Sequence, residues 1–563
     1  MSSLRNMENV HQNDETDAIV LRHSESTQAN SEPIAQRCGI VAANPDDEYS
    51  MNHKKRGIAI IINQENFNCT LKLPTRKGTN KDRDDVRKVL EKLQFQVRVL
   101  NDPSKSTLFK ELEKNAKEDH TNSDCLVVIV MTHGGPGVLY AKDEAYNIDE
   151  LWNKFTGDSC KTLHGKPKLF FIQACRGEKL DTMECDTVDA RDTSKTKRAT
   201  YTIPTMANLL VMYSIYDGSW FIQSLCAALN NHGHRKELLR ILTVVSRNVV
   251  NNYLKFEPDS EKMNALKQMP CIVSMLTKAV YFRQKSISDK PLDGENVSSV
   301  DSDDLYNNRE LSNTNPTPHN LFLKPLKKTL FKNPPSYTTE GMQQKAYIFH
   351  HHSFEVDSFS NGRKSGIEDP DNLKATFENL GFSVHDPIKD LKLCELRAKM
   401  DSIASENHED TGCVLFVIMT CGEKNLLFAK DRAYPITELL DRFSNTKCPT
   451  LSGKPKVFLI QACTKGITNP AIDPPIDVLV MYSSYIENTN PSDSEAQLLQ
   501  TVFIETLLEV LKAYDKKEDI NSILDSVRRL VVNQLIEQDP ANRETREYPS
   551  TILMSMLTKS LKL

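Results

Sequence analysis

The sequence predicts an α/β protein built from two similar domains, each with a mainly parallel central sheet flanked by helices. Two observations lead to this fold class. Short apolar runs rich in β-branched residues alternate with stretches whose apolar residues recur at helical spacing, which is the pattern of a buried parallel sheet. The whole pattern also occurs twice within the 563 residues. At roughly 100–200 residues per domain, a chain of this length has room for two to four domains.

The two copies keep one register over a long span. The segment CLVVIVMTHGG at 125–135 corresponds to CVLFVIMTCGE at 413–423, 288 residues further along the chain. SMLTK at 274–278 recurs at 555–559. Chance does not maintain such a register, so the chain is interpreted as a tandem duplication.

Strands and helices are expected in the same order in both copies. In the first copy, the apolar runs that predict strands buried on both faces are 58–63, 125–131, 168–174 and 209–214. The segments with helical spacing between them are 82–95 and 106–116.

Composition divides the chain into four parts. Residues 1–50 are polar and are expected to be a disordered prodomain, and residues 283–340, rich in Ser, Asn, Asp and Pro, are expected to be a flexible linker. The domains are then 51–282 and 341–563. A linker of this length has an r.m.s. reach of about 40–45 Å, which lets the domains lie side by side.

Charge and cysteine content exclude several classes of protein. Lys and Arg number 71 against 76 Asp and Glu, so the chain lacks the basic excess of a nucleic-acid binder. The sequence predicts neither a secretory signal nor a membrane span. The 13 cysteines are odd in number and show no paired framework. A soluble cytoplasmic protein with reduced thiols is therefore expected.

A cysteine and a histidine follow two of the expected strands. Cys175 lies in the pentapeptide Gln-Ala-Cys-Arg-Gly that begins at Gln173, and His133 is followed by Gly134. Because the carboxyl ends of parallel strands meet at one edge of a sheet, these side chains are expected to converge there. A thiol is mostly protonated at neutral pH, and a neighbouring imidazole is its usual activator. A glycine leaves its backbone N–H open to a developing oxyanion.

The pentapeptide with its upstream histidine resembles the caspase signature. The segments at 47–67, 75–86 and 218–226 also resemble effector caspases, particularly those of insects. The resemblance implies the caspase-hemoglobinase fold and an endopeptidase that cleaves after aspartate and acts in apoptosis.

The resemblance also assigns roles to residues of the first copy. Cys175 would be the nucleophile and His133 the general base and acid, with the N–H groups of Gly134 and Cys175 as the oxyanion hole. Arg76 and Gln173 would line the pocket for the substrate's aspartate, where a guanidinium suits a carboxylate. No cofactor and no metal is implied.

One expected element is missing from the first copy. Caspases carry a long loop with a Ser-Trp-Arg motif before the Gly-Ser-Trp-Phe-Ile-Gln segment, but here only three residues separate Ser214 from Gly218. The second arginine that would hold the aspartate is therefore absent. Loss of one charge-assisted hydrogen bond lowers activity roughly 10- to 150-fold, so weakened or altered specificity is expected.

Two tetrapeptides match the Asp-x-x-Asp preference of effector caspases. One ends at Asp17 in the expected prodomain, and the other ends at Asp189, where caspases place the cleavable segment between their subunits. Both are followed by alanine. Cleavage after Asp189 by an active effector caspase is expected, as for a zymogen.

The second copy has lost the base. The offset of 288 places Cys421 where His133 stands, while Cys463 remains at the position of Cys175. Losing such a base costs several orders of magnitude in rate, so this copy is interpreted as a degenerate pseudoprotease. A Cys421–Cys463 disulfide or a metal site is conceivable there but not favoured in a reducing cytosol, and His350, His351 and His352 are interpreted as a loop.

Two functions remain open. The first is a caspase-type cysteine endopeptidase in the first domain, which would act on protein substrates. The alternative is a catalytically poor pseudocaspase that regulates other caspases by binding them, as a decoy or a dimerisation partner. Because the resemblance implies a dimer-forming domain, the two copies could also form an intramolecular pseudo-dimer, with a linker that provides an effective concentration near millimolar. Nucleic-acid and membrane partners are not expected.

Overall fold

The computed structural model describes most of both copies. The described residues are 48–135, 137–155, 157–175, 201–202, 207–214, 220–256, 270–285, 336–356, 369–423, 426–465, 471–472, 474–483, 493–514, 518–538 and 551–563. The expected prodomain and linker therefore lie almost entirely outside the described residues, and so do the cleavage sites at Asp17 and Asp189.

The first half of the described chain alternates strands and helices. Its strands are β1 (Ile58–Asn63), β2 (Gln96–Asn101), β3 (Leu126–Gly135), β4 (Val138–Tyr140), β5 (Ala145–Asn147), β6 (Lys168–Cys175), β7 (Tyr201–Thr202), β8 (Leu209–Ser214) and β9 (Cys271–Ser274). Its helices are α2 (Thr79–Lys92), α3 (Lys105–Ala116), α4 (Asp149–Trp152), α5 (Trp220–His232) and α6 (Leu238–Phe256).

The second half repeats this order. Its strands are β10 (Gln343–His350), β11 (Ser383–Val384), β12 (Ile388–Lys389), β13 (Thr411–Glu423), β14 (Leu426–Phe428), β15 (Ala433–Pro435), β16 (Lys456–Lys465), β17 (Ala471–Ile472), β18 (Val478–Ser483) and β19 (Ile552–Ser555). Its helices are α9 (Asp369–Asn379), α10 (Leu393–Ala404), α11 (Ile436–Arg442), α12 (Asp493–Ala513) and α13 (Ile520–Gln538).

The main strands of each half form a mostly parallel sheet, which confirms the predicted fold class. In the first half β2, β1, β3, β6 and β8 are parallel neighbours in that order, and β9 is added antiparallel to β8. In the second half β10, β13, β16 and β18 are parallel, and β19 is added antiparallel to β18. β1 and β8 are buried along their whole length, as expected for central strands covered on both faces.

Helices cover both faces of the sheet. In the first half α2, α5 and α6 pack on one face, and α3 and α4 pack on the other. In the second half α9, α12 and α13 correspond to the first group, and α10 and α11 correspond to the second. No helix among the described residues is long and apolar enough to cross a membrane.

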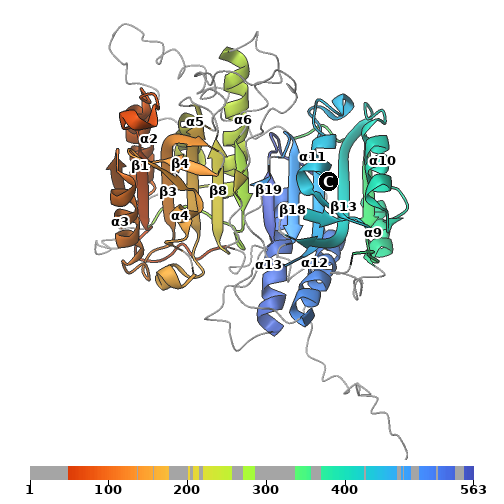
Figure 1. Ribbon diagram of the computed structural model, residues 1–563. Coiled ribbons are helices and arrows are strands. Elements are labelled where there is room, and N and C mark those ends of the chain that lie inside the picture. Colours follow the sequence, from red (N-terminus) through yellow and green to blue (C-terminus); the bar gives the residue numbers. More distant parts are fainter. Residues whose placement is uncertain are drawn as a thin grey trace, which may run out of the picture.

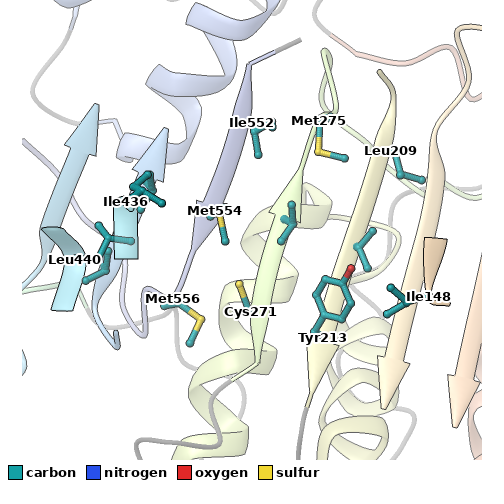
Figure 2. Close-up of a cluster of buried hydrophobic side chains, with 14 of the residues drawn as sticks. Ile148, Leu209, Tyr213, Cys271, Met275, Ile436, Leu440, Ile552, Met554 and Met556 are labelled. Carbon is teal, nitrogen blue, oxygen red and sulfur yellow. The ribbon is translucent and has the colours of Figure 1, made fainter. Parts of the chain in front are cut away.

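The two halves are joined through their last strands. β9 and β19 pair antiparallel, so the two sheets continue into one another. Figure 1 shows the halves side by side, with β19 at the boundary. One hydrophobic core passes under this junction, because Cys271 and Met275 of the first half belong to the same buried cluster as Met554 and Met556 of the second (Figure 2).

A second ladder also links the halves. β7 pairs antiparallel with β17, with Thr202 opposite Ala471 and Tyr201 opposite Ile472. β7 follows the stretch 178–200 in which cleavage was expected, and β17 lies in the corresponding stretch of the second half. The segments before β8 and β18 are therefore tied together at their backbones.

Candidate active site

The carboxyl ends of the central strands form one row of residues. Asn63, Met131, Gln173 and Ser214 lie opposite one another across β1, β3, β6 and β8. Two residues beyond this row, His133 on β3 lies directly opposite Cys175 on β6. The backbone therefore brings these two positions together, as expected. Both residues lie among the last residues of their strands and not just past the strand ends. The side chain of Cys175 is outside the described set.

The imidazole of His133 is held from two sides. Its Nε2–H donates to the carbonyl oxygen of Pro74 at 2.9 Å, and because a carbonyl can only accept, Nε2 must carry a proton. The ring of Phe67 lies against it with 5.0 Å between ring centroids. His133 is 6% exposed. These contacts fix the tautomer of the neutral ring and leave Nδ1 as the nitrogen that can take up a proton.

Arg76 is anchored beside the end of β1. Its Nη1 donates to the carbonyl oxygen of Gln64 and to the Thr79 hydroxyl, both at 3.1 Å. Thr79 in turn donates to the side-chain oxygen of Asn63 at 2.7 Å. Arg76 is half-buried. The loop therefore brings a guanidinium to the same sheet edge as Gln173, whose side chain is 2% exposed at the end of β6.

A hollow opens at this edge between β3, β6 and β8. It is lined by Gly134, Gly135, Gly137, Val138, Leu139, Ile148, Ile172, Ala174, Tyr213 and Ser214. Gly134 and Gly135 follow His133 directly, so backbone and not side chains forms one wall. A backbone wall next to the His133–Cys175 pair is the kind of surface on which N–H groups can meet an oxyanion.

The second half repeats the backbone of this site with different side chains. Cys421 on β13 lies directly opposite Cys463 on β16, at the positions of His133 and Cys175. Cys421 is 4% exposed and packs in an apolar cluster with Phe354 and Phe428. The side chain of Cys463 and all of Arg363, the counterpart of Arg76, lie outside the described residues. An apolar contact has replaced the held imidazole.

Of the three consecutive histidines, His351 and His352 lie in the loop after β10, but the prediction was wrong for His350, which extends the strand because it still pairs with Met419 of β13. His350 ends the strand, and the backbone N–H of His351 donates to Met419. The Nε2 of His351 donates to the Leu391 carbonyl oxygen at 3.2 Å, as Gln64 Nε2 donates to the Pro103 carbonyl in the first half. Within the described part of the chain, no three His, Cys, Asp or Glu side chains are grouped to hold a metal ion.

Several other cysteines are matched packing residues. Cys125 and Cys413 are fully buried at equivalent positions, and burial raises the pKa of both thiols, to about 12 for Cys413. Cys160 and Cys448 are free cysteines that are also buried at equivalent positions of the two halves. A thiol with a raised pKa is a poor nucleophile, so Cys125 and Cys413 contribute packing.

Sequence analysis missed two parts of the site. The Pro74 carbonyl and the Phe67 ring hold His133, but a carbonyl contact depends on the path of a loop and leaves no residue signature. Two sequence signals pointed to this region: Phe67 ends the caspase-like segment at 47–67, and Pro74 directly precedes the one at 75–86.

A family model, related proteins and a solved structure all match this chain to the same family. A family model described as "Caspase domain" matches residues 56–281 and again residues 343–562. The chain is similar to Caspase-1 of Spodoptera frugiperda, with 43% identity over 247 residues, which are 42% of this chain and 82% of that protein. It is similar to Caspase drICE of Drosophila melanogaster, with 40% identity over 251 residues, 43% of this chain and 74% of that protein. Among solved structures, "structure of pro-sf-caspase-1" has 42% identity and a TM-score of 0.38, and it covers 42% of this chain and 95% of that one.

Proposed function

This chain belongs to the caspase family of apoptotic cysteine proteases, and on that premise we propose that residues 51–282 form an aspartate-directed endopeptidase whose partner domain, residues 341–563, has no catalysis of its own. The observation that carries the proposal is the His133–Cys175 pair across β3 and β6, with His133 held by Pro74. A cytoplasmic location and protein substrates are part of the same proposal.

The proposed reaction uses only protein groups and water. His133 Nδ1 takes the proton of Cys175, and the thiolate attacks the backbone carbonyl carbon of the substrate's aspartate. The carbonyl electrons move to its oxygen, which accepts hydrogen bonds from the N–H groups of Gly134 and Cys175. When the carbonyl reforms, the C–N bond breaks and the leaving amine takes the proton from His133. Water, deprotonated by His133, then hydrolyses the thioester and restores the thiol.

The pocket for aspartate is proposed to be weaker than usual in the family. Arg76 and Gln173 supply its polar side, and the anchoring of Arg76 by Gln64 and Thr79 supports this role. The sequence has no Ser-Trp-Arg loop between Ser214 and Gly218 to supply a second arginine. We therefore expect slow turnover and relaxed specificity around the aspartate.

The second half is proposed to act as a permanent partner. The β9–β19 and β7–β17 ladders and the shared core support an intramolecular pseudo-dimer. The replacement of the held histidine by Cys421 in an apolar cluster supports the pseudoprotease assignment. The linker at 283–340 keeps the partner at an effective concentration near millimolar.

A second candidate function is regulation without cleavage. The chain would then bind other caspases as a decoy or dimerisation partner. The short Ser214–Gly218 connection favours this alternative, because a domain that lacks part of its substrate groove can still pair through β9.

Processing is proposed after Asp189 by an active effector caspase. β7 follows this site and is held by β17, so the new amino terminus would remain attached after the cut. An Asp189→Ala chain should resist cleavage at this position. Unchanged cleavage at the same place and rate would refute the assignment.

Turnover of a panel of aspartate-ended peptides by the full chain and by Cys175→Ala separates the two functions. Turnover that disappears with Cys175→Ala supports the protease. If turnover is absent from both proteins, or unchanged by the substitution, the protease proposal fails and the regulator is favoured.

A further inference from the structure

The junction between the halves has the form of a twofold interface made from unlike copies. In the β9–β19 ladder Val273 lies opposite Met554, its own counterpart in the other half. Ile272 pairs with Ser555, the counterpart of Ser274, and Ser274 pairs with Leu553, the counterpart of Ile272. The helices α6 and α13 begin at Leu238 and Ile520 and have equal lengths. Counterparts that face each other define an isologous geometry, so any difference between counterparts makes the interface asymmetric.

One arginine breaks the symmetry most strongly. Arg528 of α13 is 1% exposed and reaches across the junction. Its Nη1 donates to the carbonyl oxygen of Ser274 at 2.9 Å and to the Ser274 hydroxyl at 3.0 Å, and its Nη2 pairs with Asp525. The end of β9 in the first half therefore receives a buried, charge-assisted contact from the second half.

The matching position in the first half has no such group. Counting from the helix starts, Ser246 corresponds to Arg528 and Thr243 to Asp525. Ser246 is 1% exposed, and its hydroxyl has no hydrogen-bond partner among the described residues. Thr243 donates to the Leu239 carbonyl of its own helix. The interface thus carries the arginine on one side only.

Pairs of like halves would be less favourable. Two first halves would lack Arg528 at both ends of the junction. They would also place Arg240 opposite another Arg240, where Arg240 now donates to Ser522 at 2.9 Å. Like charges placed across an interface reduce the stability of that pairing.

Two second halves meet a different obstacle. Asp519 is the counterpart of Glu237, and Glu237 lies close enough to Asp525 for the two carboxyl groups to affect each other. A pair of second halves would place an Asp519 from the partner near each Asp525, in addition to the Asp519 of its own half, which already acts on that carboxyl.

We propose that Arg528 is the residue that makes β9 of the first half select the second half of this chain over another first half. This inference rests on the intramolecular pairing proposed above. The partner that fits β9 is a caspase-like domain whose helix beside the last strand carries an arginine at this position with an acid three residues before it.

Hydrogen–deuterium exchange of the full chain tests the proposal on peptides that cover β9 and β19. In Arg528→Ser, these amides should exchange about 10- to 100-fold faster than in wild type, since a charge-assisted contact is lost. Light scattering should then show dimers that increase with concentration. The matched control Arg397→Ser on α10 removes an exposed pair with Glu438 of α11, which contacts neither β9 nor Arg528, and should leave the exchange unchanged.

A transplant provides the decisive second variant. Asp525→Thr with Arg528→Ser, combined with Thr243→Asp and Ser246→Arg, moves the pair to the counterpart position facing Ser555 and should restore slow exchange of β9 and β19. If wild type is protected but Arg528→Ser exchanges at the same rate, the selection proposal is wrong and the pairing stands. If β9 and β19 are unprotected in wild type, the pairing itself is wrong. If Arg528→Ser loses protection throughout both halves, failure of the transplant to restore it overturns the proposal.

Discussion

At the carboxyl edge of the first half His133 stands opposite Cys175, and at the same place in the second half Cys421 stands opposite Cys463. The strands, their order and their register are shared. What differs is the environment: a histidine held by the Pro74 carbonyl in one half, and a cysteine packed against phenylalanine rings in the other. The comparison separates what the fold needs from what the chemistry needs.

Residues that hold the scaffold are retained in both halves. The hydroxyls of Thr132 and Thr420 donate to the carbonyls of Tyr140 and Phe428 at 2.6 and 2.5 Å. His120 and His408 are both buried, each donates Nε2 to a backbone carbonyl, and burial lowers the pKa of both. The backbone of an active site can therefore remain after its base is gone, because other residues maintain it.

The largest effect is expected when the first site is converted into the second. His133→Cys should reduce kcat/KM for an aspartate-ended peptide at least about 1000-fold, because the thiol loses its base. Cys421→Ala, the matched change in the second half, should have no effect on turnover. Near-normal activity of the His133→Cys chain would contradict the division of roles.

The next largest effect concerns an ionic cluster of the first half that has no equivalent among the described residues of the second half. The fully buried carboxylate of Asp124 pairs with Arg56 at 3.0 Å, Lys285 at 2.7 Å and His53 at 3.1 Å. Asp124→Asn should destabilise this half by about 3–5 kcal/mol, since the basic groups remain buried without their counter-charge.

Tryptophan fluorescence can measure this change in the first half alone, because both tryptophans of the chain lie there. Denaturant unfolding of Asp124→Asn should show the shift. Asp386→Asn, which removes an exposed pair with Lys374 in the second half, is the control and should leave the tryptophan transition in place. A shift of similar size in the control would show that the loss of stability does not depend on the ion pairs of Asp124.

A smaller effect is expected at the substrate pocket. Arg76→Ala should lower kcat/KM for aspartate-ended peptides about 10- to 150-fold, the loss of one charge-assisted contact. Arg363→Ala, its counterpart in the second half, should change nothing. Equal losses from both substitutions would show that both halves bind substrate.

The smallest effect is a pH dependence at the junction. Burial, and then the nearby Asp525, raise the pKa of Glu237 to about 7. The folded chain therefore binds more protons than the unfolded chain between about pH 4.5 and 7, so Glu237 makes stability fall as pH rises through that window. Glu237→Gln should remove about 1 kcal/mol or more of this decrease in thermal unfolding between pH 5 and 8. The exposed Glu91→Gln is the control, and an unchanged pH slope in Glu237→Gln would exclude this role.

Local pattern was sufficient for the central strands and for the position of the site, but not for element ends. The runs at 58–63 and 209–214 are strands with those bounds. The helix expected at 82–95 instead begins at Thr79 and ends at Lys92, because Gly78 starts it in a left-handed conformation and Gln94, at φ +69°, turns the chain toward β2.

Contacts between distant segments left no local signal. β9 has only four residues, Cys-Ile-Val-Ser, and nothing in them specifies β19 as a neighbour. The Pro74 carbonyl that holds His133 likewise depends on where a loop passes. Tertiary packing decides both, so sequence pattern could suggest a pseudo-dimer but not its register.

The most direct test of one active and one inactive half is covalent labelling of the full chain with an irreversible aspartate-ended peptide electrophile, followed by mass spectrometry. We expect one label per chain, on Cys175. This label should disappear in His133→Cys and remain unchanged in Cys463→Ala. A label on Cys463, or equal labelling of both cysteines, would contradict it.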